Sequence, residues 1–97
     1  MIKKAQVVPG ARARVKKTKS SSGFSFWPLL DNHSQIGDQW SNLGIYLKPG
    51  ATFTILSKPF KASGVSGLFV NIHVDGLEPH ELSQTFYVDV YRRAELI

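Results

Sequence analysis

The sequence predicts an all-β fold, a small OB-like barrel of five to six strands with protruding hairpins. Short stretches of the chain alternate between apolar and polar residues, which is typical of half-buried strands. Glycines and prolines separate these stretches, and no segment has a convincing long helical pattern. A chain of 97 residues has the size of one domain, so we expect residues 1–97 to form a single OB-like unit.

The first predicted strand runs from Ala5 to Val15 and has two contrasting faces. Its odd positions are small and apolar, whereas its even positions end in a cationic row at Arg12, Arg14 and Lys16. Residues on one face of a strand lie about 6.5–7 Å apart, which is close to the phosphate spacing of an extended single strand. The row therefore favours a nucleic-acid-binding strand. The alternatives are an edge strand that its cations protect from aggregation, or a mobile arm.

An aromatic strand follows the basic one. The segment from Thr18 to Gly23 has the composition of a hairpin tip, so residues 1–23 form the predicted basic strand and tip. The returning strand covers residues 24–30, and Pro28 either bends it or places it at a sheet edge. Residues 31–42 are polar and carry turn signals, which predict a long loop.

The remaining strands are predicted at residues 43–47, 51–56, 68–74 and 85–91. A Pro49-Gly50 turn joins the first two of these strands, and a second glycine-rich tip lies at residues 63–67. The third strand has apolar residues at its even positions and is predicted to turn its odd positions, Phe69 among them, outward. Residues 80–97 are expected to contribute the last strand and a C-terminal tail.

The positive charge of the chain is concentrated at its N-terminus. The first nineteen residues contain seven cations and no acid. The other residues contain five cations and seven acids, a net charge of −2, whereas the whole chain carries +5. This division indicates an electrostatic task for the N-terminal part. Neutralisation of phosphates by such cations gives sequence-independent affinity for nucleic acid through counterion release.

Phe24, Phe26 and Trp27 directly follow the basic hairpin and are candidates for stacking on bases. Stacking contributes about 1–3 kcal/mol per base and tolerates any base. Adjacent strand residues point to opposite faces, so at least one of the three rings is expected to be exposed. In the alternative, Phe24 and Phe26 lie in the core and Trp27 caps the barrel. Lys58 and Lys61 are second-rank phosphate contacts.

Little in the sequence supports catalysis or a resident metal. The chain has no cysteine, which excludes disulfides and thiolate zinc sites. His33, His73 and His80 are far apart and lack a metal-ligand spacing, so we expect no enzymatic activity, metal or cofactor. No apolar run approaches the roughly 18 residues of a membrane span, and the N-terminus lacks an apolar signal core. We therefore expect a cytoplasmic protein with neither a membrane nor a small-molecule partner.

The order of several motifs resembles the gene V single-stranded DNA-binding proteins of filamentous phages. The N-terminal half has a similar Met1-Ile2-Lys3 opening, a basic strand, and a serine-rich tip that runs into an aromatic residue. The similar motifs of the C-terminal half are Pro49-Gly50, Phe60-Lys61, Gly64, Gly67-Leu68 and a strand that ends near Leu77-Glu78-Pro79.

The resemblance implies a helix-destabilising protein that forms a two-fold dimer of OB-like barrels and coats single-stranded phage DNA during replication. It also implies that Phe26 matches the family's stacking tyrosine. Val65 stands where the second tip of the family presents an aromatic residue, and residues 80–97 extend beyond the family pattern.

These observations together predict a non-enzymatic, homodimeric single-stranded DNA-binding protein that acts in phage or mobile-element DNA replication in the host cytoplasm. One alternative is a small β protein for protein–protein contact, such as a phage or mobile-element assembly factor, whose basic arm docks on an acidic partner or lines a particle interior. Another is an RNA-binding barrel of ribosomal or translational type. The predicted nucleic-acid-binding residues are Arg12, Arg14, Lys16, Lys17, Lys19, Phe24, Phe26, Trp27, Lys58 and Lys61.

Overall fold

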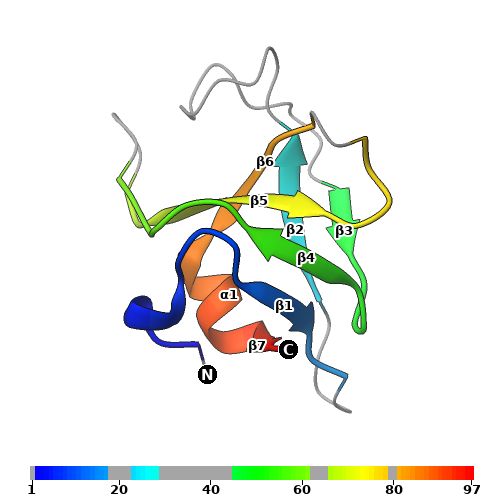
Figure 1. Cartoon of the computed structure of the whole chain (residues 1–97), viewed down its shortest axis with the longest axis horizontal. Helices are drawn as coiled ribbons and strands as arrows, with labels where there is room; N and C mark the ends of the chain where they lie inside the picture. The colour runs from blue at the N-terminus through cyan, green and yellow to red at the C-terminus, as the bar shows by residue number, and fades with distance from the viewer. Residues whose placement is uncertain (1, 18–22, 29–44, 62–65, 79–80) are drawn as a thin grey trace.

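The computed structural model of the protein describes residues 2–17, 23–28, 45–61, 66–78 and 81–97. Within these residues, seven antiparallel strands form one sheet in the order β3-β2-β6-β5-β4-β1-β7. The sheet curls into a half-barrel (Figure 1). The predicted all-β, barrel-like class is confirmed, with seven short strands in place of five to six. The strands are β1 (Arg12–Val15), β2 (Phe24–Pro28), β3 (Ile45–Leu47), β4 (Thr52–Ile55), β5 (Phe69–Val74), β6 (Ser83–Phe86) and β7 (Ala94–Leu96).

Several predicted features lie outside the described residues. They include most of the first hairpin tip with Lys19, the loop at residues 31–42, and the second tip with Val65. His33 and His80 lie outside them as well.

The predicted N-terminal strand forms only in its second half. β1 begins at Arg12, whereas the 3₁₀-helix η1 (Lys4–Gln6) and a turn precede it. The predicted strand was therefore wrong for its first half. Two residues account for the break: Pro9 has no N–H for a ladder, and Gly10 adopts a φ of 92°, which lies outside the range of a β-strand. Val7 is nevertheless fully buried, so the segment before β1 is anchored in the core.

The alternation predicted for the central strands is confirmed. Ala13 and Val15 of β1 are buried, and the register places Ala13 opposite Phe53 of β4. The same inward face includes Ile55 of β4 and the even positions of β5. Burying a large apolar side chain contributes roughly 1.5–3 kcal/mol, so this shared face holds the half-barrel together. The core residues on the sheet are Ala13, Val15, Phe24, Phe26, Leu47, Phe53, Ile55, Val70, Ile72, Val74 and Ala94.

The strand predicted at residues 85–91 is wrong after Phe86. The chain turns there into the helix α1 (Tyr87–Arg93), and β7 then returns to pair with β1. The sequence carries both periods, because apolar residues at 86, 88 and 90 alternate while Tyr87, Val90 and Ala94 are spaced as on a helix. In the helix Val90 is completely buried and Val88 is 47% exposed, and Ala94, which follows the helix at the start of β7, is completely buried as well.

The outer face of the sheet carries a second, smaller aromatic cluster. Phe69, which was predicted to face outward, is completely buried by rings from neighbouring segments. Its centroid lies 4.9 Å from that of Phe86 and 6.5 Å from that of Phe60. Trp27 extends the cluster, with its ring edge-on to Phe86 at 5.5 Å. The aromatic strand β2 therefore contributes rings to both faces.

No helix among the described residues has the length and apolar character needed to cross a bilayer.

Candidate nucleic-acid interface

The cationic row of β1 has the predicted alternation. Arg12 and Arg14 alternate with the buried Ala13 and Val15, and Lys16 follows at the end of the strand. The arginines, however, are held by carboxylates from distant parts of the chain.

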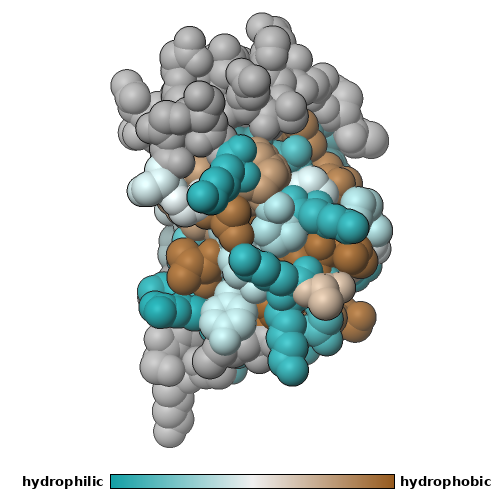
Figure 2. All heavy atoms as spheres, turned by 90° about the vertical axis from the view of Figure 1, so that its left-hand side faces the viewer, coloured by the Kyte–Doolittle hydropathy of each residue, from teal (hydrophilic) through white to brown (hydrophobic). Residues whose placement is uncertain are grey.

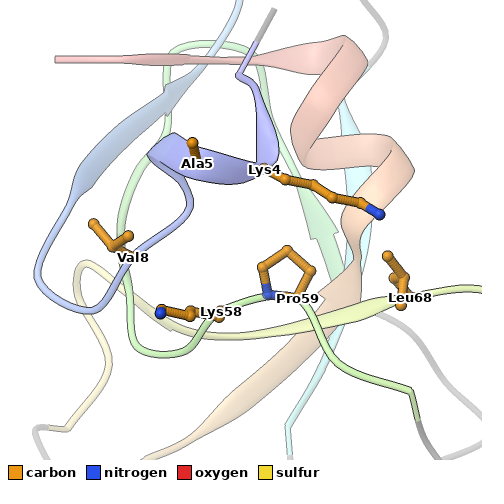
Figure 3. Close-up of a pocket in the computed structure, with 6 residues that line it drawn as sticks. All are labelled: Lys4, Ala5, Val8, Lys58, Pro59 and Leu68. Carbon is orange, nitrogen blue, oxygen red and sulfur yellow. The ribbon is translucent and has the colours of Figure 1, made fainter.

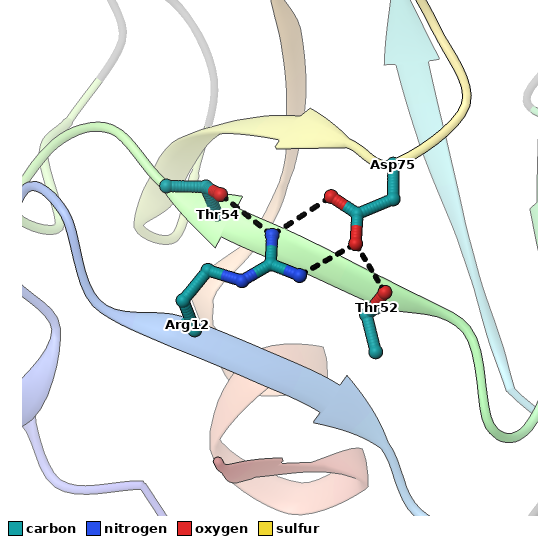
Figure 4. Close-up of polar contacts among 4 residues, drawn as sticks. All are labelled: Arg12, Thr52, Thr54 and Asp75. Atoms are coloured by element: carbon teal, nitrogen blue, oxygen red, sulfur yellow. Dashed lines mark hydrogen bonds and ion pairs between the residues drawn. The ribbon is translucent and has the colours of Figure 1, made fainter.

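Arg12 belongs to a polar network on the outside of β1 and β4 (Figure 4). Its guanidinium donates to both carboxylate oxygens of Asp75, at 2.7 and 2.6 Å, and to the hydroxyl of Thr54 at 2.8 Å. The hydroxyl of Thr52 donates to the same carboxylate. Hydrogen bonds from Arg12 and then from Thr52 lower the pKa of Asp75 from its ordinary 3.8 to about 2. The guanidinium of Arg12 thus binds both oxygens of one carboxylate, which is the bidentate arrangement typical of arginine–carboxylate pairs.

Arg14 has a looser partner. Its Nη2 lies 3.4 Å from Oε2 of Glu95, which pairs with it across the β1–β7 ladder. Both side chains are 43% exposed, and solvent-accessible pairs of this kind contribute about 0–1 kcal/mol. Arg12 and Arg14 are thus paired with carboxylates within the protein, and the role of the row Arg12, Arg14 and Lys16 as phosphate contacts stays a prediction.

The predicted stacking rings are also corrected by the structure. Phe24 and Phe26 are only 5% and 3% exposed, and Phe24 packs edge-on against Phe53 at 6.1 Å. Buried rings cannot stack on bases, so the stacking role predicted for these two residues is wrong and the core alternative holds. They share the inward face of β2 because alternate residues of a strand point to the same face, whereas Trp27 points to the other. Trp27 is partly buried in the outer aromatic cluster rather than beside the basic strand.

The predicted lysines fall into two groups. In the antiparallel register Arg12 lies opposite Thr54 and Arg14 opposite Thr52, so Lys16 and Lys58 continue past opposite ends of the β1–β4 pair. Lys17 belongs to the first group. Lys61, beyond Lys58 in sequence, belongs to the second, and both are exposed. The structure therefore does not bring all the predicted phosphate contacts to one surface.

The first group forms what we term the basic end, which consists of Lys16, Lys17 and Lys48. The Gly50 N–H donates to the Val15 carbonyl at 2.8 Å, which holds the β3–β4 turn against the end of β1. A Cβ placed on Gly50 would lie 2.5 Å from Cε of Lys17, so the Lys17 side chain lies directly on this turn. Lys48 begins the same turn, and its carbonyl accepts from Ala51 at 3.0 Å.

The end of α1 joins the basic end from the other side. The Lys16 N–H donates to the Arg93 carbonyl at 2.9 Å. The guanidinium of Arg93 donates to the Gly23 carbonyl at 2.9 Å and lies 3.9 Å from Asp89. Among the described residues, no carboxylate lies within ion-pair distance of any basic-end lysine. The lysines thus differ from the arginines in lacking a carboxylate partner in the described part of the chain.

An exposed aromatic ring lies beside this junction. Tyr46 of the edge strand β3 is 53% exposed. A Cβ placed on Gly23 would lie 2.9 Å from its hydroxyl, and the carbonyl of Gly23 is the one that Arg93 binds. The ring therefore lies beside Gly23, whose carbonyl Arg93 of α1 binds, and Lys48 of the β3–β4 turn follows Tyr46 two residues later. Such a surface offers point charges for phosphates and a flat face for a base.

Tyr46 and Lys48 were missed as site residues from the sequence, although a signal was present. Within residues 43–47 the apolar residues occupy the odd positions, which turns Tyr46 outward, and Lys48 has the same parity. What the pattern could not show is that the β3–β4 turn packs against the end of β1.

No protein-family model matches this chain, and neither a curated protein nor a solved structure matches it.

Proposed function

We propose that this chain is a non-enzymatic single-stranded DNA-binding protein of phage or mobile-element replication that binds through the basic end and Tyr46. The proposal rests on three lysines that gather where the β3–β4 turn packs against the end of β1, and on the half-exposed ring of Tyr46, which lies two residues before Lys48 of that turn. None of the lysines has a carboxylate partner within the described residues. The site thus differs from the one expected from the sequence, which centred on the arginines and the buried phenylalanines.

The mechanism requires only binding. Lysine ammonium groups neutralise successive phosphates and release condensed counterions, which supplies affinity without regard to sequence. The Tyr46 ring stacks on a base, which is available only where the base is unpaired. Because the complex forms with unpaired strands alone, it shifts the melting equilibrium of a duplex toward the separated strands by mass action.

The test is a fluorescence-anisotropy titration of the whole chain with a labelled oligo(dT), repeated with a duplex of equal length and at several salt concentrations. Three lysine–phosphate contacts give an expected log–log salt slope of about −2, from roughly 0.7 per single-strand contact. The oligo(dT) should bind more tightly than the duplex. A slope near zero, or tighter binding of the duplex, would contradict the proposal.

The same titration with oligo(U) separates DNA from RNA binding. Since neither the lysines nor Tyr46 reads a 2′-hydroxyl, the expected preference for DNA is small. A strong preference for oligo(U) would favour the RNA-binding alternative.

A further inference from the structure

A pocket of about 440 Å³ lies at the opposite end of β1 from the basic end. It lies between η1 and the segment that follows β4, and both of these segments are on the left-hand side of Figure 1. Its lining consists of Lys4, Ala5, Val8, Lys58, Pro59 and Leu68, which are shown in Figure 3.

Both walls of the pocket are fixed by the fold. The wall formed by η1 and Val8 is anchored by Ile2 and Val7, which are buried on either side of η1. Gly10 then donates to the carbonyl of Ile55 at 2.8 Å, so the chain after Val8 is tied to β4. The opposite wall is held by Phe60 and Phe69, which exchange backbone hydrogen bonds of 2.9 and 2.8 Å. A ligand would therefore meet a preformed site.

The lining combines an aliphatic floor with positive charge at the rim. Ala5, Val8, Pro59 and Leu68 supply apolar surface, and no acidic residue is among the six lining residues. The side chains of Lys4 and Lys58 point in opposite directions along the pocket (Figure 3).

The surface around the pocket continues this pattern. The face viewed in Figure 2 shows hydrophilic side chains standing between apolar areas. Lys3 precedes η1 and Lys61 follows the opposite wall, and both are exposed. The pocket thus suits a ligand that is apolar at its centre and anionic on both sides.

The lining also separates two classes of macromolecule that could bind here. A nucleobase is held in single-strand sites by flat aromatic rings, and none of the six lining residues is aromatic. Branched and cyclic aliphatic side chains instead suit a leucine or proline side chain. We propose that this pocket binds an acidic peptide segment of a partner protein, in which one apolar side chain enters the pocket and flanking carboxylates contact Lys4 and Lys58. This second site does not depend on the proposed DNA-binding function.

The test uses the full chain and a fluorescein-labelled peptide, Gly-Asp-Asp-Leu-Pro-Asp-Asp-Gly, at protein concentrations up to about 1 mM, where affinities of only a few kcal/mol are still detected. The control peptide carries serine in place of both leucine and proline and has the same charge. The double variant Lys4→Ala/Lys58→Ala should weaken binding of the leucine peptide about tenfold, since it removes two exposed charge pairs. The matched variant Lys16→Ala/Lys17→Ala has the same net charge and should bind the peptide within about twofold of the original chain.

A second variant probes the apolar floor. Val8→Asp changes a residue that is already 37% exposed, so the fold should persist, and the new carboxylate should repel the peptide. A circular dichroism melt of each variant checks that the fold is retained.

Three results would overturn the proposal. The first is no saturable binding of the leucine peptide, and the second is binding of the serine peptide as tight as that of the leucine peptide. The third is an equal loss of peptide affinity in Lys4→Ala/Lys58→Ala and in Lys16→Ala/Lys17→Ala. A fourth would be loss of oligo(dT) affinity in Lys4→Ala/Lys58→Ala without loss of peptide affinity, which would assign the pocket to nucleic acid. Failure of the basic-end titration with oligo(dT) would leave the peptide measurement unaffected, so the two proposals fail separately.

Discussion

The arginines within β1 and the lysines at its C-terminal end carry similar charge but use it differently. Arg12 pairs with Asp75, which follows β5, and Arg14 pairs with Glu95 of β7, so their charges connect β1 to other parts of the sheet. At the end, Lys16 and Lys17 lie beside a turn and a helix terminus without a carboxylate partner in the described residues. The position of a cation along a charged segment therefore does not by itself indicate whether the cation can bind a ligand. Its partner within the folded protein must be known as well.

The largest effect on DNA binding is expected from removing the basic end. The variant Lys16→Ala/Lys17→Ala/Lys48→Ala should lower oligo(dT) affinity roughly 30-fold at low salt, because three exposed charge contacts are lost. The salt slope should fall toward zero, since each lost contact removes about 0.7 from it. Anisotropy titrations at several salt concentrations measure both quantities.

An alanine at Arg12 provides the control for this comparison. If Arg12→Ala reduced oligo(dT) affinity as much as the lysine triple variant does, the distinction between the arginines of β1 and the lysines at its end would fail.

Tyr46 is expected to have the next largest effect. Tyr46→Ala should lower oligo(dT) affinity about tenfold, within the 1–3 kcal/mol that a stacked base contributes. Tyr46→Phe keeps the ring and should bind nearly as well as the original chain. Quenching of tyrosine fluorescence on binding, present in the original chain and reduced in Tyr46→Phe and Tyr46→Ala alike, gives a second readout. Equal affinities of the phenylalanine and alanine variants would exclude stacking at this position.

The Arg12 network should affect stability more than binding. The pKa of Asp75 is about 2 in the folded protein, below its ordinary 3.8, so its ionised form stabilises the fold. This contribution is complete above about pH 4 and is lost as the pH falls through 2. Asp75→Asn should therefore have a lower melting temperature than the original chain at pH 7. At pH 2 the difference between the two melting temperatures should be smaller. If the difference in melting temperature were the same at pH 7 and at pH 2, the pairing of Arg12 with Asp75 would be contradicted.

The smallest expected effect comes from releasing Arg14. Glu95→Gln removes the carboxylate that lies 3.4 Å from the guanidinium and leaves the β1–β7 ladder intact. One more cation then becomes available beside the basic end, so oligo(dT) affinity should rise about two- to threefold. Asp75→Asn is the matched change at Arg12. A fall in affinity for Glu95→Gln would show that the Arg14–Glu95 pair itself supports binding.

The fold was more predictable from the sequence than the site. The alternation at β4 and β5 and the turn at Pro49-Gly50 follow local rules, and the structure reproduces them. The error at α1 arose because one segment satisfies both the strand period and the helix period. The burial of Val90 and Ala94, which depends on the rest of the core, selects between them.

The candidate site was less predictable because stacking and pairing depend on long-range packing. The ring of Phe26 faces inward from β2, whereas the ring of Tyr46 faces outward from β3. Of the two rings, only that of Tyr46 is exposed. Local sequence marks each as an aromatic residue in a short strand. The neighbours of each strand in the sheet decide which ring a ligand can reach.

The sequence by itself determined the segregation of positive charge, the strand periods and the turns, because these depend on the order of neighbouring residues. The tertiary structure alone decided which cations are available. The partner of Arg12 lies 63 residues away and that of Arg14 81 residues away. Ion pairs act over a few ångströms of space, so their effect on a charged strand emerges only when folding brings distant carboxylates to it.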